Sequence, residues 1–550
     1  MLTSRAFHLF FLSNVLLVCA GNCCPQSSPD APVSAILKIS NADLVAAPVG
    51  GNWPSYNGDY TGRRYSSLSE ITPLNVAQLR AQWAFHAPNS DILEVTPVVV
   101  NGVMFLTAAN DAYALDARTG RTIWHYSRPV TQGLVDDASR HLNRGVGIWN
   151  SHIYMNTDNA HLLCLDAISG HLLWDVAYAD WNKNYGATSA PLVINGKVLV
   201  GTSGGDDGVR GFVAAYDAES GKLLWRFWTI PGPGEPGSES WPGDMYLHGG
   251  GTTWMPGTYD PLLNTVYWGV SNASPDFDGD VRPGDDLYTC SVLALDPDTG
   301  KLKWHFQFTP HDLYDYDAEE TAVLVDADYK GKPRKLLLEA NRNGFIYVLD
   351  RATGEFLSAT RFAEKLNWTK GIDSKGRPIL DKDSAKPTPE GTKVCPGFSG
   401  ATNWFSPSFN PATRTLYFMA QEECTVLISG KQNFKEGETY YATGSRRPPG
   451  EHGQKTLLAF DLDTAAFRWR YPQASSGRWS AAGTMTTASG LVFFGDNSES
   501  FEAVDANTGK PLWYFQTGQP IHASPMSYAA NGKQYVAIAA GTDVFSFALP

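Results

Sequence analysis

One motif recurs along this chain of 550 residues and constrains its fold more than any other feature. Each copy is an apolar run ending in Asp, a tight turn with Gly, and then Trp, as in ALDARTGRTIW up to Trp124. Gly supplies the positive φ that such a turn requires, and Asp accepts hydrogen bonds from the N–H groups of the turn. Each copy therefore predicts strand, turn and strand, with the Trp ring packed into the neighbouring unit. The motif aspartates are Asp116, Asp166, Asp217, Asp296, Asp350, Asp461 and Asp505.

The spacing of the motif predicts the number of units. Most intervals are about fifty residues long, which is enough for four short strands with their loops. The interval from Asp350 to Asp461 is about twice as long, so we expect a unit without the motif there, with strands at 416–419 and 424–428. Seven motifs and this unit predict an all-β, eight-bladed β-propeller with Trp-docking repeats, a single domain over residues 50–550.

The two ends of the repeat region distinguish a closed ring from an open array. A linear solenoid is the alternative, but it requires polar capping units, and both ends here are apolar. We expect the stretch near Trp83 to pair with the C-terminal runs YVAIAAG and VFSFALP in one blade that closes the ring. The insertions at 231–251, 362–395 and 429–455 are expected to form surface loops over one end of the ring.

The N-terminal segment predicts export. Residues 1–24 carry Arg5, a short apolar run and a small-residue site, which predicts a signal peptide cleaved after Ala20 and a periplasmic protein. Cys19 leaves a lipid anchor as the alternative, which Val18 disfavours. No later apolar run is long enough to cross a membrane. The net charge of −13 provides no basic surface, so nucleic acid is disfavoured as a partner.

The remaining cysteines divide into two pairs. Cys395 and Cys424 flank a segment with turn signals, and in an exported protein we expect a disulfide between them. Cys164 and Cys290 lie in apolar runs and are predicted to be buried thiols. No CxxCH motif occurs, so this chain attaches no c-type haem of its own.

The stretch TPHDLYDYD, from Thr309 to Asp317, is the most acidic candidate for a site. It places Asp312, Asp315 and Asp317 within six positions. If the segment is extended, Asp315 and Asp317 face the same side, where two carboxylates repel unless a cation lies between them. A hard cation with oxygen ligands is the natural partner. A solvated acidic loop is the alternative.

Further polar segments interrupt the strand pattern, and together they indicate a family. The runs SGGDDGVRGF, GGGTTW, RPGDDLYTCSVLALD and TPHDLYDYD occur in this order, within the Trp repeats. This combination resembles the dehydrogenases that use pyrroloquinoline quinone (PQQ), namely the large subunits of methanol and ethanol dehydrogenases. The resemblance covers residues 50–550 and implies an eight-bladed propeller that holds PQQ near its axis, beside one metal ion.

The resemblance also implies roles for individual residues in holding PQQ. Trp254 would be the aromatic floor under the quinone, and Arg144 would pair with a cofactor carboxylate. Arg342 would lie beside the reacting quinone oxygen and stabilise the reduced form. The other implied contacts are Glu94, Thr188, Ser203, Gly204, Gly205, Thr252, Asn403 and Trp404.

The implied metal ligands are Asp206, Asn272 and Asp315, with Asp315 also the catalytic base. Asp206 departs from the Glu that is usual in the family and has a shorter reach. Asp317 resembles the carboxylate of the lanthanide-using branch, since a trivalent ion tolerates one more negative ligand than calcium. Calcium, with Asp317 serving only the loop, is the alternative.

One family feature is missing. Ala138 and Ser139 stand where the family has an adjacent cysteine pair over the cofactor, so we expect that face to be covered differently or to be more open.

The implied activity is oxidation of an alcohol to an aldehyde or ketone. The metal would polarise a quinone carbonyl, Asp315 would remove the hydroxyl proton, and a hydride would pass from the alcohol carbon to the quinone. An external carrier such as a soluble cytochrome c would then take the electrons. The alternatives are a non-catalytic periplasmic propeller scaffold and a decayed relative that no longer binds the cofactor.

Overall fold

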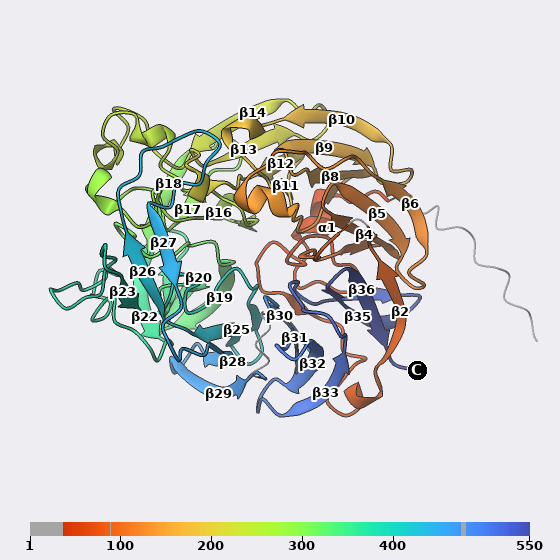
Figure 1. Ribbon diagram of the computed structural model, residues 1–550. Helices are drawn as coiled ribbons and strands as arrows, with labels where there is room; N and C mark the ends of the chain where they lie inside the picture. The colour runs from red at the N-terminus through yellow and green to blue at the C-terminus, as the bar shows by residue number, and fades with distance from the viewer. Residues whose placement is uncertain (1–36, 89, 475–479) are drawn as a thin grey trace, which may run out of the picture. The chain divides into compact units, whose positions relative to one another are not determined.

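Each Trp motif forms the turn between the third and fourth strands of an antiparallel sheet. The computed structural model describes residues 37–88, 90–474 and 480–550, so the expected signal peptide and Cys19 lie outside the described residues. The described residues all belong to one compact unit. Within it, the sheets follow one another in chain order around the unit (Figure 1).

Seven sheets carry the motif. The first consists of β3 (Val98–Val100), β4 (Val103–Ala108), β5 (Asp111–Asp116) and β6 (Thr122–Tyr126), and the second of β7 (Gly147–Trp149), β8 (His152–Asn156), β9 (His161–Asp166) and β10 (Leu172–Ala177). The third consists of β11 (Leu192–Ile194), β12 (Lys197–Val200), β13 (Phe212–Asp217) and β14 (Leu223–Trp228). The fourth consists of β15 (Thr258–Asp260), β16 (Thr265–Val270), β17 (Ser291–Leu295) and β18 (Leu302–Gln307). The next three consist of β19 (Val323–Tyr329), β20 (Lys332–Ala340), β21 (Phe345–Asp350) and β22 (Glu355–Arg361); β24 (Ser408–Asn410), β25 (Thr415–Glu422), β28 (Gln454–Asp461) and β29 (Ala466–Pro472); and β30 (Thr484–Thr487), β31 (Leu491–Gly495), β32 (Ser500–Asp505) and β33 (Pro511–Gln516), with β1 (Tyr65–Ser66) parallel to β30.

One further four-stranded sheet joins the two ends of the repeat region. Strand β2 (Arg80–His86) pairs antiparallel with β36 (Asp543–Ala548), and β35 (Lys533–Ala540) and β34 (Met526–Ala530) follow. Figure 1 shows the orange β2 beside the blue β36. The predicted pairing of the Trp83 stretch with the C-terminal runs is therefore confirmed.

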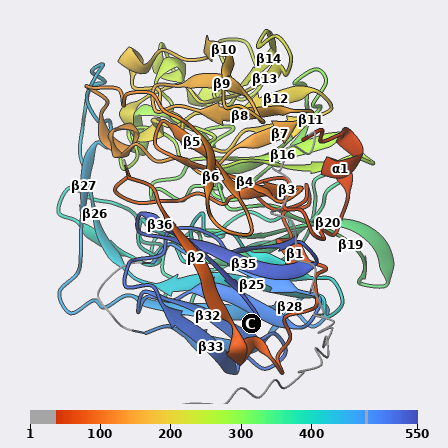
Figure 2. The same cartoon turned by 90° about the vertical axis from the view of Figure 1, so that its right-hand side faces the viewer.

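The interval between Asp350 and Asp461 differs from the prediction. Residues 416–419 lie in β25, which belongs to the Asp461 sheet. Most of the 424–428 run forms β26 (Thr425–Ser429), which pairs with β23 (Thr392–Val394) and β27 (Thr443–Arg446) in a separate three-stranded sheet. The prediction of a motif-free four-stranded unit here was wrong, because an apolar run does not reveal which partners its strand will find. Figure 2 shows β26 and β27 at one edge of the unit, opposite α1 (Asn41–Val45).

The motif tryptophans connect successive sheets, as predicted. The Trp124 indole donates to the Ala167 carbonyl at 2.9 Å, and its ring lies against Gly170 in the turn of the next repeat. A Cβ on Gly170 would come within 2.7 Å of that ring, so only glycine allows this close approach. Four further contacts have the same geometry and join Trp83 to Gly120, Trp225 to Gly300, Trp304 to Gly354, and Trp469 to Gly509.

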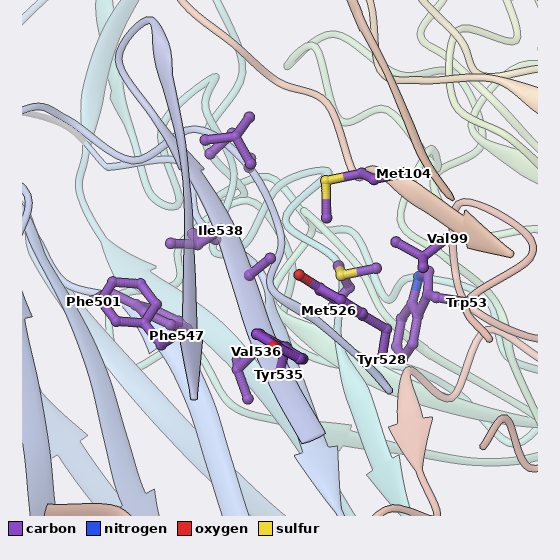
Figure 3. Packing of buried hydrophobic residues seen from close by; sticks show 14 of the residues in the cluster. Trp53, Val99, Met104, Phe501, Met526, Tyr528, Tyr535, Val536, Ile538 and Phe547 are labelled. Carbon is purple, nitrogen blue, oxygen red and sulfur yellow. The ribbon is translucent and has the colours of Figure 1, made fainter. Parts of the chain in front are cut away.

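The closing sheet shares a core with its neighbours. Buried side chains of β34, β35 and β36 pack between those of the first and the last repeat sheets (Figure 3). The labelled members include Trp53, Val99, Met104, Phe501, Met526, Tyr528, Val536, Ile538 and Phe547.

Short 3₁₀ helices occupy several of the connecting loops. They are η1 (Val76–Gln78), η2 (Asp136–Arg140), η3 (Trp181–Lys183), η4 (Gly205–Asp207), η5 (Ser238–Ser240), η6 (Met245–Leu247) and η7 (Gly279–Val281).

The cysteine predictions are confirmed. Cys395 and Cys424 form a disulfide, and Cys164 and Cys290 are buried thiols. In the part of the chain that the structure describes, no helix is long and apolar enough to span a membrane.

Candidate active site

A cavity of about 540 Å³ is lined by loops from most of the repeat sheets. Every residue that the sequence singled out for cofactor, metal or catalysis lines it. They are Glu94, Arg144, Thr188, Ser203, Gly204, Gly205, Asp206, Thr252, Trp254, Asn272, Asp315, Asp317, Arg342, Asn403 and Trp404. Residues up to 310 positions apart therefore converge on one space that is large enough for a small cofactor.

The acidic stretch is bent at Asp315, so the condition under which Asp315 and Asp317 would face the same side of an extended segment is not met. Asp315 adopts the left-handed φ of +63°, because the Asp312 carboxylate accepts from the backbone N–H groups of Tyr314, Asp315 and Tyr316 and bends the chain around itself. Asp312 is thus the scaffold of the turn. Its burial raises the pKa of its carboxyl to about 6, although Arg282 opposes the shift.

Arg342 lies between the other two carboxylates. Its Nη2 is 2.7 Å from Asp317 Oδ2, and its Nη1 is 3.4 Å from Asp315 Oδ1 and 2.9 Å from the Asp315 carbonyl. Asp317 also accepts from the Trp254 indole at 3.2 Å and from the Asn272 backbone N–H at 2.7 Å. Both oxygens of Asp317 therefore face protein donors, and the cation next to this pair of carboxylates is a guanidinium.

The electrostatics favour a basic Asp315. Burial raises the pKa of its carboxyl well above the usual value, Arg342 lowers it, and Asp206 and Asp317 raise it further. A carboxylate whose charge is opposed by its surroundings is a stronger proton acceptor than a solvated one. Burial alone lowers the pKa of Arg342, but Asp317 and Asp315 outweigh it, so this side chain remains charged.

The donors for a metal ion lie beside Asp315. Asp206 is in η4, and the Asn272 amide donates to its Oδ1 at 3.2 Å. Ser274 Oγ donates to the Gly205 carbonyl at 2.7 Å and fixes the two loops together. Carboxylate and amide oxygens suit a hard cation. Across residues 37–88, 90–474 and 480–550, no group of three or more His, Cys, Asp or Glu residues is arranged to hold a metal, so an ion here depends on the Asn272 amide as well.

A second part of the cavity suits a flat anion. The Arg144 guanidinium carbon lies 5.0 Å from the ring centroid of Trp254 and 4.6 Å from that of Trp404. Its Nη2 is 2.6 Å from Glu94 Oε2, and its Nη1 donates to Thr188 Oγ1 at 2.6 Å.

An unsatisfied hydroxyl borders this part of the cavity. The buried Ser203 Oγ has no hydrogen-bond partner within the described structure, next to the bare backbone of Gly204 and Gly205. Aromatic faces, a guanidinium and a hydroxyl that lacks a partner fit a planar cofactor with carboxylates.

The sequence did not indicate two further polar residues that line the cavity. Asp276 is fully buried in the cavity wall, and its Oδ2 has no partner among the residues described. Burial, and then Asp206 and Asp315, raise the pKa of its carboxyl well above the usual value. Its position four residues after Asn272, in the same loop, was the available signal.

The second is Tyr441, which reaches the cavity on the 430–442 loop between β26 and β27. Burial, Asp206 and Asp136 raise its pKa well above the usual value, so its phenol stays protonated. No local pattern in the sequence marks it.

Ala138, which stands at one of the two positions of the missing cysteine pair, lies close to Ser203. A Cβ placed on Gly186 would be 2.9 Å from Ala138 Cβ and 2.7 Å from Ser203 Oγ, so Ala138 and Ser203 border the same glycine. Ser139, the next residue, is exposed.

Comparisons with known proteins agree with this arrangement. Residues 53–361 and 455–536 match the family model described as "Glucose/ethanol/alcohol dehydrogenase, beta-propeller domain". The quinohemoprotein alcohol dehydrogenase ADH-IIG of Pseudomonas putida is 38% identical, over 96% of this chain and 77% of that protein. A "1-butanol dehydrogenase (cytochrome c)" of Thauera butanivorans is 35% identical, over 90% of this chain and 74% of its own length. A solved europium-containing methanol dehydrogenase superposes with a TM-score of 0.84 at 30% identity, and covers 92% of this chain and 99% of that one.

Proposed function

This chain belongs to the PQQ-dependent quinoprotein alcohol dehydrogenases, and we propose that its cavity converts an alcohol to an aldehyde or ketone with PQQ, one metal ion and Asp315 as the base. One observation carries the proposal. A buried carboxylate with a raised pKa, a guanidinium and a set of hard oxygen donors converge in the same cavity as two tryptophans and Arg144.

The chain's own residues would bind and orient the cofactor. Trp254 offers a ring face, and Arg144 offers a guanidinium that Glu94 and Thr188 already hold in place. Gly204 and Gly205 let the backbone approach closely, and Ser203 contributes a hydroxyl without another partner. The remaining contacts come from Thr252, Asn403 and Trp404.

The metal would be held by Asp206, Asn272 and Asp315. Asp317 adds negative charge beside this set, which favours a trivalent lanthanide over calcium. Arg342 neutralises part of that charge and links Asp317 to Asp315.

When bound, PQQ would supply the acceptor for the two electrons and the hydrogen that leave the alcohol carbon. Asp315 would take the hydroxyl proton at a carboxylate oxygen, since its side chain lines the cavity beside the proposed metal donors. The Arg342 guanidinium, 3.4 Å from that carboxylate, stabilises negative charge that develops nearby.

We extend the proposal to the setting of the reaction. The eight sheets of four or five strands in the described residues would be the eight blades of one propeller. Export would place the enzyme in the periplasm, and a soluble cytochrome c would be the electron acceptor. The relative named for cytochrome c supports this acceptor.

Reconstitution tests the proposal against a scaffold or a decayed relative. The purified chain is incubated with PQQ and either calcium or a light lanthanide, and quinone absorbance and alcohol-dependent dye reduction are measured. We expect both signals. A protein that binds PQQ without turnover would contradict the catalytic assignment, and one that binds no PQQ would favour the scaffold or the decayed relative.

A further inference from the structure

The 430–442 loop is fastened to three other segments at the cavity. The Tyr440 backbone N–H donates to the Asp206 carbonyl at 2.6 Å, and the Tyr441 carbonyl accepts from the Phe277 N–H at 3.1 Å. The Tyr441 hydroxyl donates to Asp136 Oδ2. Tyr441 lines the cavity itself, and it is bonded to Phe277, which also lines it, and to Asp136 of η2.

The bond to Asp136 links the 430–442 loop to η2, the helix that lacks the family's cysteine pair. Asp136 begins η2, which contains Ala138 and Ser139. The Tyr441 phenol, from a distant loop, therefore contacts the helix in which the family's cysteine pair is missing. Tyr441 is half-buried, and the exposed Phe398 lines the same cavity, so these rings border its mouth.

The backbone after Tyr441 is strained. Ala442 has a φ of +55° and Thr443 has a φ of +124°, a value that a β-branched residue rarely adopts. Such outliers persist only where the surroundings impose them, and they cluster at functional sites. Two hydrogen bonds hold the ends of the loop together. The Gly430 N–H donates to the Ala442 carbonyl at 2.9 Å, and the Ala442 N–H donates to Gln432 Oε1 at 2.7 Å.

We propose that Tyr441, positioned by Asp136, determines which alcohols reach Asp315 by narrowing the mouth of the cavity. The inference rests on the proposed function and deepens it, because it assigns size selection to a residue pair outside the cofactor and metal contacts. The ring excludes bulky alcohols, and the bond to Asp136 prevents the ring from swinging aside.

The test compares alcohols of different size. The full chain is reconstituted with PQQ and metal, and kcat/KM is measured for ethanol, butanol and octanol. We expect Tyr441→Ala to raise the octanol-to-ethanol ratio of kcat/KM roughly tenfold. Tyr441→Phe and Asp136→Ala should each give a smaller increase, and their combination should add little, since both remove the bond between Tyr441 and Asp136.

Two variants serve as controls. Asp136→Asn retains an acceptor oxygen and should restore the wild-type ratio. Tyr440→Phe is the matched neighbour, because the Tyr440 hydroxyl lies 4.0 Å from Met245 Sδ and the residue does not line the cavity. It should leave the ratio unchanged. The melting temperature of each variant excludes general unfolding as the cause.

The outcomes separate the two proposals. If wild type oxidises ethanol and Tyr441→Ala has the wild-type octanol-to-ethanol ratio, size selection by Tyr441 is overturned and the proposed function stands. If reconstituted wild type shows neither quinone absorbance nor alcohol oxidation, the proposed function is overturned, and this inference with it.

Discussion

Arg342 and Asp317 form a buried ion pair, with 2.7 Å between Nη2 and Oδ2. The same guanidinium reaches Asp315, while Asp317 also anchors the Trp254 indole and the Asn272 backbone. Asp317 therefore connects the proposed base, the proposed floor of the cofactor and a proposed metal ligand. Removing one partner of a buried pair leaves an uncompensated charge, so changes at Asp317 are expected to affect all three.

The first prediction concerns the choice of metal. Asp317→Ala removes one negative charge from the site, and we expect the preference for a trivalent lanthanide over calcium to fall roughly tenfold or more. Terbium luminescence, with calcium as competitor, measures this ratio. Asp278→Asn is the control, since Asp278 caps η7 and does not line the cavity. An unchanged ratio in Asp317→Ala would show that Asp317 serves only the loop.

The second prediction concerns the base. Asp315→Ala is expected to lower kcat by about 10²- to 10⁴-fold or to abolish turnover, because it removes the proposed acceptor of the hydroxyl proton. The melting temperature should change little, since the Asp312 carboxylate holds the turn. Quinone absorbance confirms that PQQ is bound. Full alcohol oxidation by this variant with bound cofactor would show that another residue is the base.

The third prediction isolates the Trp contact between sheets. Gly170 and Gly102 both have positive φ, at +74° and +80°, but a Cβ would meet the Trp124 ring at 2.7 Å only at Gly170 and open space at Gly102. Gly102→Ala should lose unfolding free energy only through its strained backbone. Gly170→Ala should lose about 1–3 kcal/mol more, because its Cβ also meets the Trp124 ring. Urea unfolding of both variants measures the difference. Equal losses would mean that the ring yields without cost.

Local chemistry explains what the sequence predicted. The turn after Asp116 and the contact of Trp124 with the next repeat each depend on residues within the motif, so the repeated sheets could be read from the chain. The prediction that Glu94, Arg144 and Asp315 lie in one site rested on the resemblance of several motifs to a known family, and no local pattern brings these residues together.

Long-range contacts explain what the sequence did not predict. The 424–428 run has the apolar character of a blade strand, and only its partners β23 and β27 place it elsewhere. Tyr441 reaches the cavity through bonds to Asp136 and Phe277, which are far from it in the chain.

The last prediction concerns a buried acid outside the cavity. Glu339 lies in β20, where its Oε1 accepts from Asn341 Nδ2 at 3.0 Å and its Oε2 has no hydrogen-bond partner in the described parts of the chain. Burial, and then Glu320, raise the pKa of Glu339 well above the usual 4.5. The folded state therefore holds this proton more tightly than the unfolded state does. The stability that this provides is complete below the unfolded pKa and is lost as the pH rises through the folded pKa.

Glutamine at this position keeps the shape but does not titrate. Glu339→Gln should have the wild-type melting temperature near pH 4 and an increasingly higher one towards pH 8. At pH 8 the gain should correspond to about 1–3 kcal/mol of unfolding free energy. Glu355→Gln is the control, because Glu355 is exposed and pairs with Arg334 at the surface, where such pairs contribute little. Melting at a fixed scan rate over this pH range measures both. A gain for Glu339→Gln that is independent of pH would show that packing, and not the buried charge, is responsible.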